Sequence, residues 1–474
     1  MLTVYTASMR IITLLLSVLF CFSNTLVAQT TWRFEDAVRN YAYRSIDHPP
    51  VPGCTLFAGS SSFAGWKNLE ETFADYEAVN RGFGGSTFLD NLRVIEWIHL
   101  PIQPAKIVIF CGTNDIAGGA DAETVFNNFT FYIARTWNEN PATEIYFVSV
   151  THAPVREKLW SIGDELCAKI KQLSETVKGL FFIDIISPME DENGKVREDL
   201  FVADRLHLNE TGYAIWAKTF KGVLDEQDKN RQKPNLVELY ASRKAAGLFD
   251  DSRFAEQGIA VRDYSEPPRK RALVFIGDNV MLDEVPSRCF YFLTANGYDE
   301  IAFASWASNA GTTFDLTPDG EEYKHIKNSA DRLNEGKDRE LIFSIMLGAN
   351  DSAKQPPLSP EEYRRNMKAI VDKLLTDYPA SKVVLHRPIG YPAAEQLRLQ
   401  AYFPELKILV DFYSHSTAKG RVFLGDVSAF HYFQTNAEKV FAKQKPNTFH
   451  IPLNERGADV LGRFWGSAIL QALR

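Results

Sequence analysis

The chain contains 474 residues, of which 45% are hydrophobic, 24% charged and 12% aromatic. This composition is typical of a folded globular protein, and it excludes a disordered, collagen-like or disulfide-scaffold chain. The formal net charge is -8, because 52 Lys and Arg residues face 60 Asp and Glu residues. We therefore expect no electrostatically driven binding of nucleic acid. The length leaves room for two domains of about 200 residues each.

The amino terminus has the pattern of a secretory signal peptide. Arg10 precedes an apolar run over residues 11–22, and a polar break then leads to the small residue Ala28. A basic start, a short apolar run and a small residue at the cleavage point are typical of such a signal. We predict a signal peptide over residues 1–28 and export to the periplasm or the outside of the cell. We expect no stable membrane anchor, since a spanning helix needs roughly 20 apolar residues.

The segment that follows alternates between strand-like and helix-like stretches. The apolar, strand-like runs cover residues 56–59, 107–111, 145–150 and 181–185, and the helix-like stretches cover residues 122–138 and 157–177. Such alternation predicts βαβ units on a parallel sheet. We assign residues 29–224 to this first domain.

A charged segment over residues 225–270 comes next. It contains basic stretches at residues 229–233 and 267–271, and it has no strong strand pattern. We interpret it as a connector with some helix, packed mostly on the surface.

The remaining residues, 271–474, repeat the pattern of the first domain. Four segments correspond in the same order: residues 273–279 to 56–62, 310–314 to 84–88, 342–351 to 107–115, and 450–457 to 207–213. Four matched segments in one order indicate an internal duplication. We therefore predict a second domain of the same α/β type.

Residues with catalytic potential follow the predicted strands of the first domain. In open α/β sheets, reactive groups gather beyond the carboxyl ends of the strands. Ser61 lies where the first strand turns, and a serine becomes a nucleophile when a base such as His207, oriented by an acid such as Asp204, takes its proton. The backbone N–H of Gly85 and the side-chain amide of Asn114 are suitable donors to the oxyanion of a tetrahedral intermediate.

The four matched segments of the first domain, 56–62, 84–88, 107–115 and 207–213, resemble the SGNH hydrolase superfamily, also called the GDSL esterases. The resemblance extends over about residues 55–220. The resemblance implies two flavodoxin-like three-layer α/β/α domains, each with a mostly parallel central sheet. It also implies that Ser61 is the nucleophile, that Gly85 and Asn114 form the oxyanion hole, and that Asp204 and His207 supply the acid and the base.

The phrases at residues 80–85 and 111–115 resemble a narrower branch of that superfamily. This branch is related to platelet-activating-factor acetylhydrolase and to bacterial carbohydrate acetylesterases. One position departs from the common Gly-Asp-Ser form, because Ser60 replaces the aspartate before the nucleophile.

The second half departs further from the pattern. Asn279 aligns with Ser61, and Asn447 aligns with Asp204, whereas Gly311, Asn350 and His450 are retained. An amide cannot serve as the nucleophile. We predict a degenerate, non-catalytic copy, which could bind a sugar chain or cover an apolar face of the first domain.

Other residue types give weaker signals. Cys54, Cys111, Cys167 and Cys289 form neither a Cys-x-x-Cys pair nor a metal-ligand pattern, so we expect neither a metal site nor a cofactor. A Cys54–Cys111 disulfide is possible in an oxidising compartment, but buried free thiols are the favoured interpretation. His152 and Arg156 follow a predicted strand and could touch substrate, but a solvated loop is favoured there.

The leading hypothesis is therefore an exported serine esterase that removes short acyl groups, above all acetyl, from carbohydrate. The carbohydrate rests on the family resemblance and on export. One alternative is a lysophospholipase- or thioesterase-type acylhydrolase with a broad apolar channel. The other is a glycan-binding protein without turnover. The expected partner is a small-molecule or glycan ester, and the oligomeric state stays open.

Overall fold

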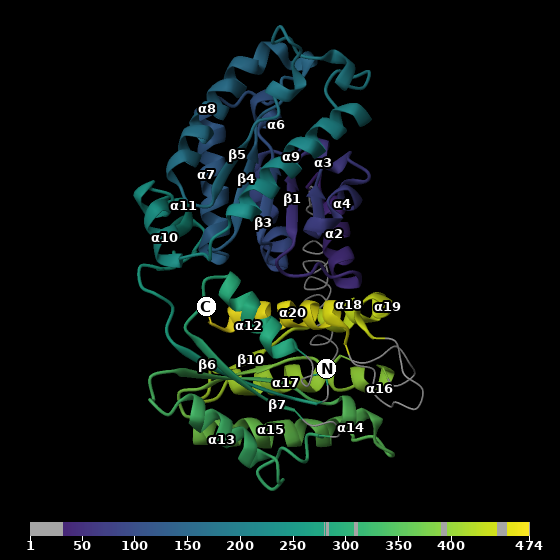
Figure 1. Ribbon diagram of the computed structural model, residues 1–474, viewed down its shortest axis with the longest axis vertical. Coiled ribbons are helices and arrows are strands. Elements are labelled where there is room, and N and C mark those ends of the chain that lie inside the picture. The colour runs from purple at the N-terminus through teal and green to yellow at the C-terminus, as the bar shows by residue number, and fades with distance from the viewer. Residues whose placement is uncertain are drawn as a thin grey trace, which may run out of the picture. The chain divides into compact units, whose positions relative to one another are not determined.

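The computed structural model describes residues 32–278, 280, 284–307, 311–389, 396–442 and 453–473. The predicted signal peptide lies outside these residues, as do Asn279, Asn447 and His450. The chain divides into two compact units, Met1–Asn40 and Tyr41–Arg474. Both sheets belong to the second unit (Figure 1).

The first sheet has five parallel strands in the order β2-β1-β3-β4-β5. These strands are β1 (Thr55–Gly59), β2 (Ala78–Gly82), β3 (Lys106–Phe110), β4 (Glu144–Val148) and β5 (Leu180–Ile183). The strand β1 pairs with both β2 and β3. The strand β2 is added on one side of β1, and β3 to β5 follow on its other side, so the order of strand addition switches at β1. This is the flavodoxin-like strand order, in which ligands bind beyond the carboxyl ends of the strands at the switch point.

Helices connect the strands of the first sheet. The main helices are α2 (Glu35–Asp47), α3 (Ser61–Ala64), α4 (Leu69–Thr72), α5 (Phe88–Val94), α6 (Thr113–Ala117), α7 (Ala122–Glu139), α8 (Trp160–Thr176) and α9 (Glu210–Asn230). Short turns of helix lie at η1 (Ala74–Tyr76), η2 (Ile95–His99), η3 (Leu100–Ile102), η4 (Pro154–Leu159), η5 (Ser187–Met189) and η6 (Glu198–Leu200). In residues 225–270 the structure places the end of α9, then α10 (Leu236–Ala245) and α11 (Arg253–Glu256).

The sequence explains where several of these helices begin. Thr87 and Asp90 form a reciprocal capping box at the start of α5, and the Asp121 side chain accepts the Thr124 N–H at the start of α7. The Asn209 side chain does the same for Gly212 at the start of α9. Each side chain satisfies an N–H that has no partner inside its helix.

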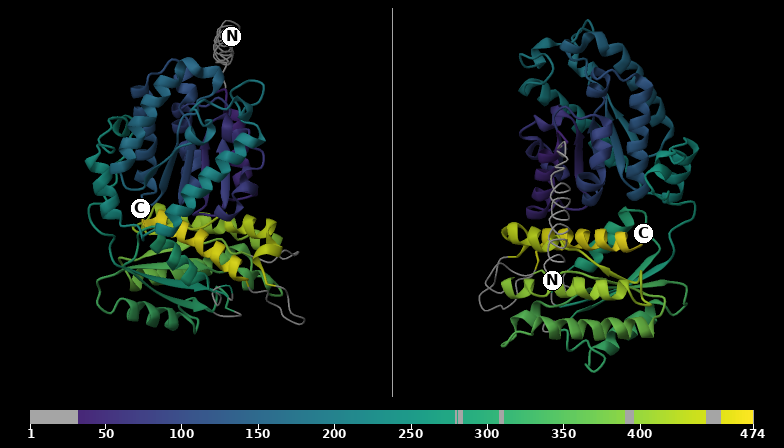
Figure 2. Two further views of the ribbon diagram at one scale, coloured as in Figure 1. Left: turned by 45° about the horizontal axis from the view of Figure 1, so that its top comes forward. Right: turned by 180° about the vertical axis from the view of Figure 1, so that it is seen from behind.

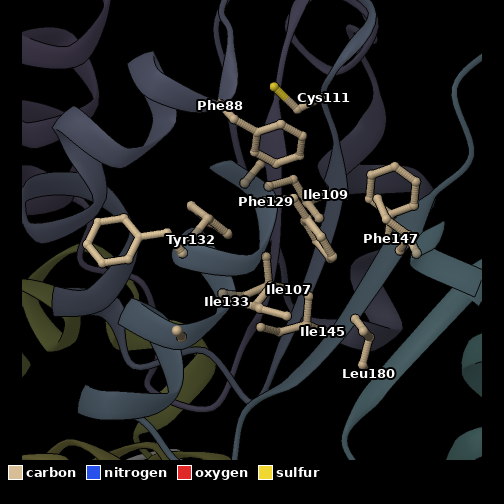
Figure 3. Close-up of a cluster of buried hydrophobic side chains, with 14 of the residues drawn as sticks. Phe88, Ile107, Ile109, Cys111, Phe129, Tyr132, Ile133, Ile145, Phe147 and Leu180 are labelled. Carbon is tan, nitrogen blue, oxygen red and sulfur yellow. The ribbon is translucent and has the colours of Figure 1, made fainter. Parts of the chain in front are cut away.

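Alternate residues of each central strand pack on opposite faces of the first sheet. Leu56 and Ala58 join a buried cluster that also contains α5, α7 and α8, whereas Phe57 joins one that contains α3 and α9. Figure 3 shows the first cluster, in which Ile107 and Ile109 of β3 lie among Phe88, Phe129 and other side chains of the helices. Burial on both faces explains why the strands read as continuous apolar runs.

The second sheet also has five parallel strands, in the order β10-β9-β8-β6-β7. They are β6 (Arg271–Gly277), β7 (Ile301–Ala307), β8 (Glu340–Met346), β9 (Lys382–Leu385) and β10 (Val422–Leu424). Read from its other edge, this is the order of the first sheet, with β6 in the place of β1. The two parallel sheets with their flanking helices confirm the predicted α/β fold class.

The helices of the second half cover both faces of its sheet. They are α12 (Val285–Ala295), α13 (Tyr323–Leu333), α14 (Ala349–Ala353), α15 (Pro360–Asp377), α16 (Gln396–Gln400), α17 (Phe403–Ser414), α18 (Ala429–Thr435), α19 (Ala437–Val440) and α20 (Glu455–Leu473). Helices α12 and α20 pack on one face, and α13, α15 and α17 pack on the other. Figure 2 shows the yellow α20 and the green α13 and α15 on opposite sides of this sheet.

The four described cysteines are free and buried, which confirms the favoured interpretation. Cys54 precedes β1, whereas Cys111 follows the neighbouring parallel strand β3 at its opposite end. At about 3.3 Å per residue, the two positions are about 20 Å apart, which is too far for a disulfide.

Across the described ranges, we find no helix with the length and apolar character needed to span a bilayer.

Candidate active site

Ser61 lies at the switch point of the first sheet, where β1 ends and α3 begins. The turn depends on Gly59, whose φ of 127° lies in the region that favours glycine. A Cβ on Gly59 would lie 2.0 Å from the Phe110 carbonyl oxygen. The Ser60 N–H then donates to the same oxygen at 3.1 Å. This close backbone contact between β1 and β3 directs the chain into α3 and places Ser61 beyond the sheet edge.

Ser61, His207 and Asp204 form a continuous hydrogen-bonded chain. The Ser61 Oγ lies 2.8 Å from His207 Nε2, and His207 Nδ1 lies 2.6 Å from Asp204 Oδ2. The structure therefore brings together three residues that the sequence analysis predicted as nucleophile, base and acid. Serine and histidine come from loops 146 residues apart in the chain.

The Asp204–His207 loop is held by its own backbone. The Asp204 Oδ1 accepts the N–H groups of Leu206 and His207, each at 2.9 Å. Arg205 has a φ of 57°, and this left-handed residue lets the loop close. The hydrogen bonds from His207 and Leu206 lower the pKa of Asp204 to about 2, so its carboxylate is ionised at neutral pH.

The two predicted oxyanion-hole residues lie on separate segments, Gly85 in the turn before α5 and Asn114 in the first turn of α6. Gly85 has a φ of 81°, and the space where a Cβ would project is empty within 4 Å. The Asn114 Nδ2 donates to the Ser86 carbonyl oxygen at 3.1 Å. This bond joins the Asn114 side chain to the residue directly after Gly85 and orients the amide toward that loop.

A buried carboxylate supports this arrangement. Asp115 accepts the Phe88 N–H at 3.1 Å, and the Ser86 hydroxyl donates to the Gly59 carbonyl oxygen at 2.9 Å. Burial raises the pKa of Asp115 to about 6. These bonds tie the loop that carries Gly85 both to β1 and to α6, so the loop has a defined position relative to Ser61.

A pocket of about 530 Å³, part of it open to solvent, adjoins Ser61. Ser61, Asn114 and Thr113 form one wall, and further lining residues come from the segment after β4. The lining residues of that segment are Val150, Thr151, His152, Ala153, Arg156, Leu159, Trp160 and Gly163. The pocket thus combines apolar walls with polar groups next to Ser61, as small-molecule sites usually do.

The structure places His152 in the loop after β4 and Arg156 in η4, and both side chains are half-buried and line this pocket. The Arg156 Nη2 donates to the Asn114 Oδ1 at 2.9 Å. His152 stacks on Trp160, with ring centroids 4.6 Å apart and an interplanar angle of 13°. Their position in the segment after β4 could have predicted that they lie near Ser61, since parallel strands end at the same edge of a sheet.

The second half repeats the supporting hydrogen bonds of the first. The Asn350 Nδ2 donates to the Gly311 carbonyl oxygen at 2.9 Å, as Asn114 does to Ser86. Asp351 accepts the Thr313 N–H at 3.1 Å, as Asp115 accepts that of Phe88.

These bonds correct the predicted alignment of Gly311. Gly311 occupies the position of Ser86 and not that of Gly85, because its carbonyl oxygen accepts the hydrogen bond from Asn350, as that of Ser86 accepts the bond from Asn114. The Thr312–Asp315 pair agrees with this shift, since it repeats the Thr87–Asp90 pair. The other predicted residues of the second site, Asn279 and His450, lie outside the described residues.

Comparisons with solved structures give several partial matches. They include a Streptococcus pneumonia protein whose description refers to platelet activating factor, with 22% identity, a TM-score of 0.37, and coverage of 44% of this chain and 98% of that one. A GDSL-like lipase from Bacteroides thetaiotaomicron has 21% identity, a TM-score of 0.35, and coverage of 40% and 97%. A family 3 carbohydrate esterase from Clostridium thermocellum has 15% identity, a TM-score of 0.31, and coverage of 38% and 99%.

No curated protein matches the chain. Residues 51–215, which contain Ser61, Gly85, Asn114, Asp204 and His207, match the model of the GDSL-like Lipase/Acylhydrolase family. This segment of the chain is a GDSL-like lipase/acylhydrolase domain.

Proposed function

We propose that the first domain is a serine esterase that releases short acyl groups, above all acetyl, from carbohydrate. The observation that carries the proposal is the unbroken chain from Ser61 through His207 to Asp204, with bonds of 2.8 and 2.6 Å. A serine with a positioned base and an ionised acid can form an acyl-enzyme. The match to an acylhydrolase family supports the same chemistry.

The reaction proceeds in two halves. The Ser61 Oγ attacks the ester carbonyl while His207 Nε2 takes the hydroxyl proton, and the Gly85 N–H and Asn114 Nδ2 donate to the oxyanion. The C–O bond to the alcohol then breaks, and His207 returns the proton to the leaving oxygen. A water molecule next attacks the acyl-enzyme, with His207 as its base, and the products are the free acid and regenerated Ser61.

The pocket favours a polar substrate over a long acyl chain. Thr151, His152 and Arg156 present polar groups among its apolar walls. An alkyl chain would remove these groups from water without giving them hydrogen-bond partners, which is unfavourable. A sugar alcohol offers hydroxyl groups to them. The export predicted from residues 1–28 would bring the protein to where acylated polysaccharides occur, which supports the proposal.

The first experiment is hydrolysis of p-nitrophenyl acetate, butyrate and octanoate by the protein lacking residues 1–28. We expect the acetyl ester to be the best of the three, and Ser61→Ala to abolish turnover. Ser60→Ala is the matched control, because its hydroxyl makes no capping hydrogen bond and lies outside the pocket lining. Acetate release from acetylated oligosaccharides then tests the carbohydrate.

Two outcomes would contradict this function. A clear preference for the octanoyl ester would favour a lysophospholipase- or thioesterase-type enzyme. Folded protein that hydrolyses none of these esters or acetylated glycans, but binds the glycans, would favour a binding protein without turnover.

A further inference from the structure

The pocket beside Ser61 has an unbalanced charge. Of its lining residues, Arg156 is cationic, and no carboxylate is among those that the structure describes there. His152 has acidic partners behind the pocket wall: its Nε2 lies 2.7 Å from Asp164 Oδ1, and its Nδ1 lies 3.9 Å from Glu190 Oε1. His152 thus has acidic neighbours supplied by the protein itself.

Arg156 has no such compensation. Within the described ranges its guanidinium forms no ion pair, and its hydrogen bond to a protein acceptor goes to the neutral amide oxygen of Asn114 at 2.9 Å. The side chain is half-buried. Partial burial lowers the pKa of Arg156 below its ordinary value because it removes water from the charged group, yet a guanidinium stays protonated in proteins.

A half-buried guanidinium without an ion pair is suited to bind an anion. A guanidinium has five N–H donors in a planar fork, and one edge suffices for Asn114. The remaining donors face a cost of lost hydration that an acidic ligand group would offset. Carboxylate matches the fork with two parallel hydrogen bonds, which a neutral hydroxyl cannot do.

We propose that Arg156 binds a carboxylate of the substrate, so that the natural ester carries an acidic group near its acyl bond. The inference rests on the proposed esterase function and names its substrate class. The carboxylate could belong to the sugar, as in an acetylated uronic acid, or to the acyl group, as in a succinyl half-ester. In either case one guanidinium holds both the substrate and Asn114, and thereby aligns the ester with the oxyanion hole.

Matched pairs of esters test the inference and separate the two sources. O-acetylglucuronic acid against O-acetylglucose places the charge on the sugar, and mono-p-nitrophenyl succinate against p-nitrophenyl butyrate places it on the acyl group. We expect a preference in kcat/KM of at least about tenfold for the acidic member of one pair. The pair that shows the preference identifies the source.

Variants then assign the preference to Arg156. Arg156→Gln keeps a side-chain N–H donor but removes the charge, and we expect it to lower the acidic-to-neutral ratio about ten- to a hundredfold. Arg156→Lys should retain part of the ratio, since it keeps the charge without the fork. The matched control is Lys158→Gln, which removes the same charge from an exposed side chain of η4 outside the pocket lining, and should leave the ratio unchanged.

Three results would overturn the inference. The first is equal kcat/KM for both members of each pair in the wild-type protein. The second is an unchanged ratio in Arg156→Gln with both rates lowered equally, which would mean that Arg156 only positions Asn114. The third, needing no variant, is equal inhibition of the wild type by glucuronate and glucose, together with equal inhibition by succinamate, which carries a carboxylate, and butyramide, which does not. Failure of the proposed function is distinct, because then the neutral esters would show no Ser61-dependent hydrolysis either.

Discussion

The two halves of the chain share one scaffold but differ at the end of the central strand. Both sheets have the same strand order, and both use a buried aspartate, Asp115 or Asp351, to hold the loop after the second strand. After β1 the chain places Ser60 and Ser61, whereas after β6 it places Asp278 and Asn279. The scaffold hydrogen bonds therefore persist without the nucleophile. These bonds maintain the fold, and the chemistry proposed for the first half depends on a few further residues at the strand ends.

The largest effect should come from making the first half resemble the second at the nucleophile. Ser61→Asn introduces the residue found at the corresponding position of the second half, and we expect about a millionfold loss of kcat because no acyl-enzyme can form. Ester hydrolysis and circular dichroism measure activity and folding. Substantial residual turnover in a folded variant would show that the catalytic serine lies elsewhere.

A smaller loss of kcat should follow when Asp204, the predicted acid, is replaced by the asparagine found at the aligned position of the second half. Asp204→Asn replaces the ionised carboxylate by an amide, as at position 447, and leaves His207 without its acceptor. We expect kcat to fall about ten-thousandfold with little change in KM, since the histidine tautomer is no longer held. Steady-state kinetics on p-nitrophenyl acetate provide the measurement. A loss of less than about tenfold would exclude Asp204 as the orienting acid.

The stability of the second half should depend on pH through Asp278, whereas the first half has the non-titrating Ser60 at the corresponding position. Asp278 is fully buried, and its Oδ2 has no hydrogen-bond partner in the part of the chain that the structure describes. Burial raises its pKa to about 7, and the charge of Asp351 adds to this. Because the folded-state pKa exceeds the ordinary 3.8, this contribution to the free energy of unfolding is complete below about pH 4 and is lost as the pH rises through 7.

Asp278→Asn should remove that dependence. Relative to the wild type, we expect the variant to gain about 2 to 4 kcal/mol between pH 4.5 and 8. Calorimetric unfolding at both pH values measures the difference, and the exposed Asp319→Asn is the matched control. Equal pH dependence in the wild type and Asp278→Asn would contradict the buried, protonated carboxyl.

The smallest effect on esterase activity should come from giving the second half the serine of the first. Asn279→Ser restores a hydroxyl to the second half, but Asn447 would still leave His450 without an acid, so we expect no measurable gain in esterase activity. The assay uses the Ser61→Ala background, in which any new turnover must come from the second half. A robust rate there would show that the second half retains a working base.

Much of the fold and of the candidate site follows from local sequence pattern. The alternation of apolar strands and amphipathic helices predicts the parallel sheets, and the matched segments predict their duplication. Ser61 at a strand end, and Asp204 three residues before His207, are recognisable because short stretches of chain decide their local geometry. The structure joins them as expected, with Ser61 2.8 Å from His207.

Contacts between distant segments are what local pattern could not predict. Arg156 and Asn114 lie 42 residues apart and meet because β3 and β4 end at the same edge of the sheet. The equivalence of Gly311 to Ser86 became clear from the hydrogen bond that Asn350 donates to its carbonyl oxygen. Likewise, only the pairing of β1 with β3 shows that Cys54 and Cys111 lie at opposite ends of the sheet.

The primary structure thus decided the fold class and the identity of the candidate catalytic residues, since hydrophobic period, turn residues and short spacings act within a few residues of each other. The tertiary structure decided which loops surround Ser61, and therefore the size and charge of the pocket. Those properties arise from side chains that approach only after the strands have paired, and a linear pattern does not specify which loops will meet.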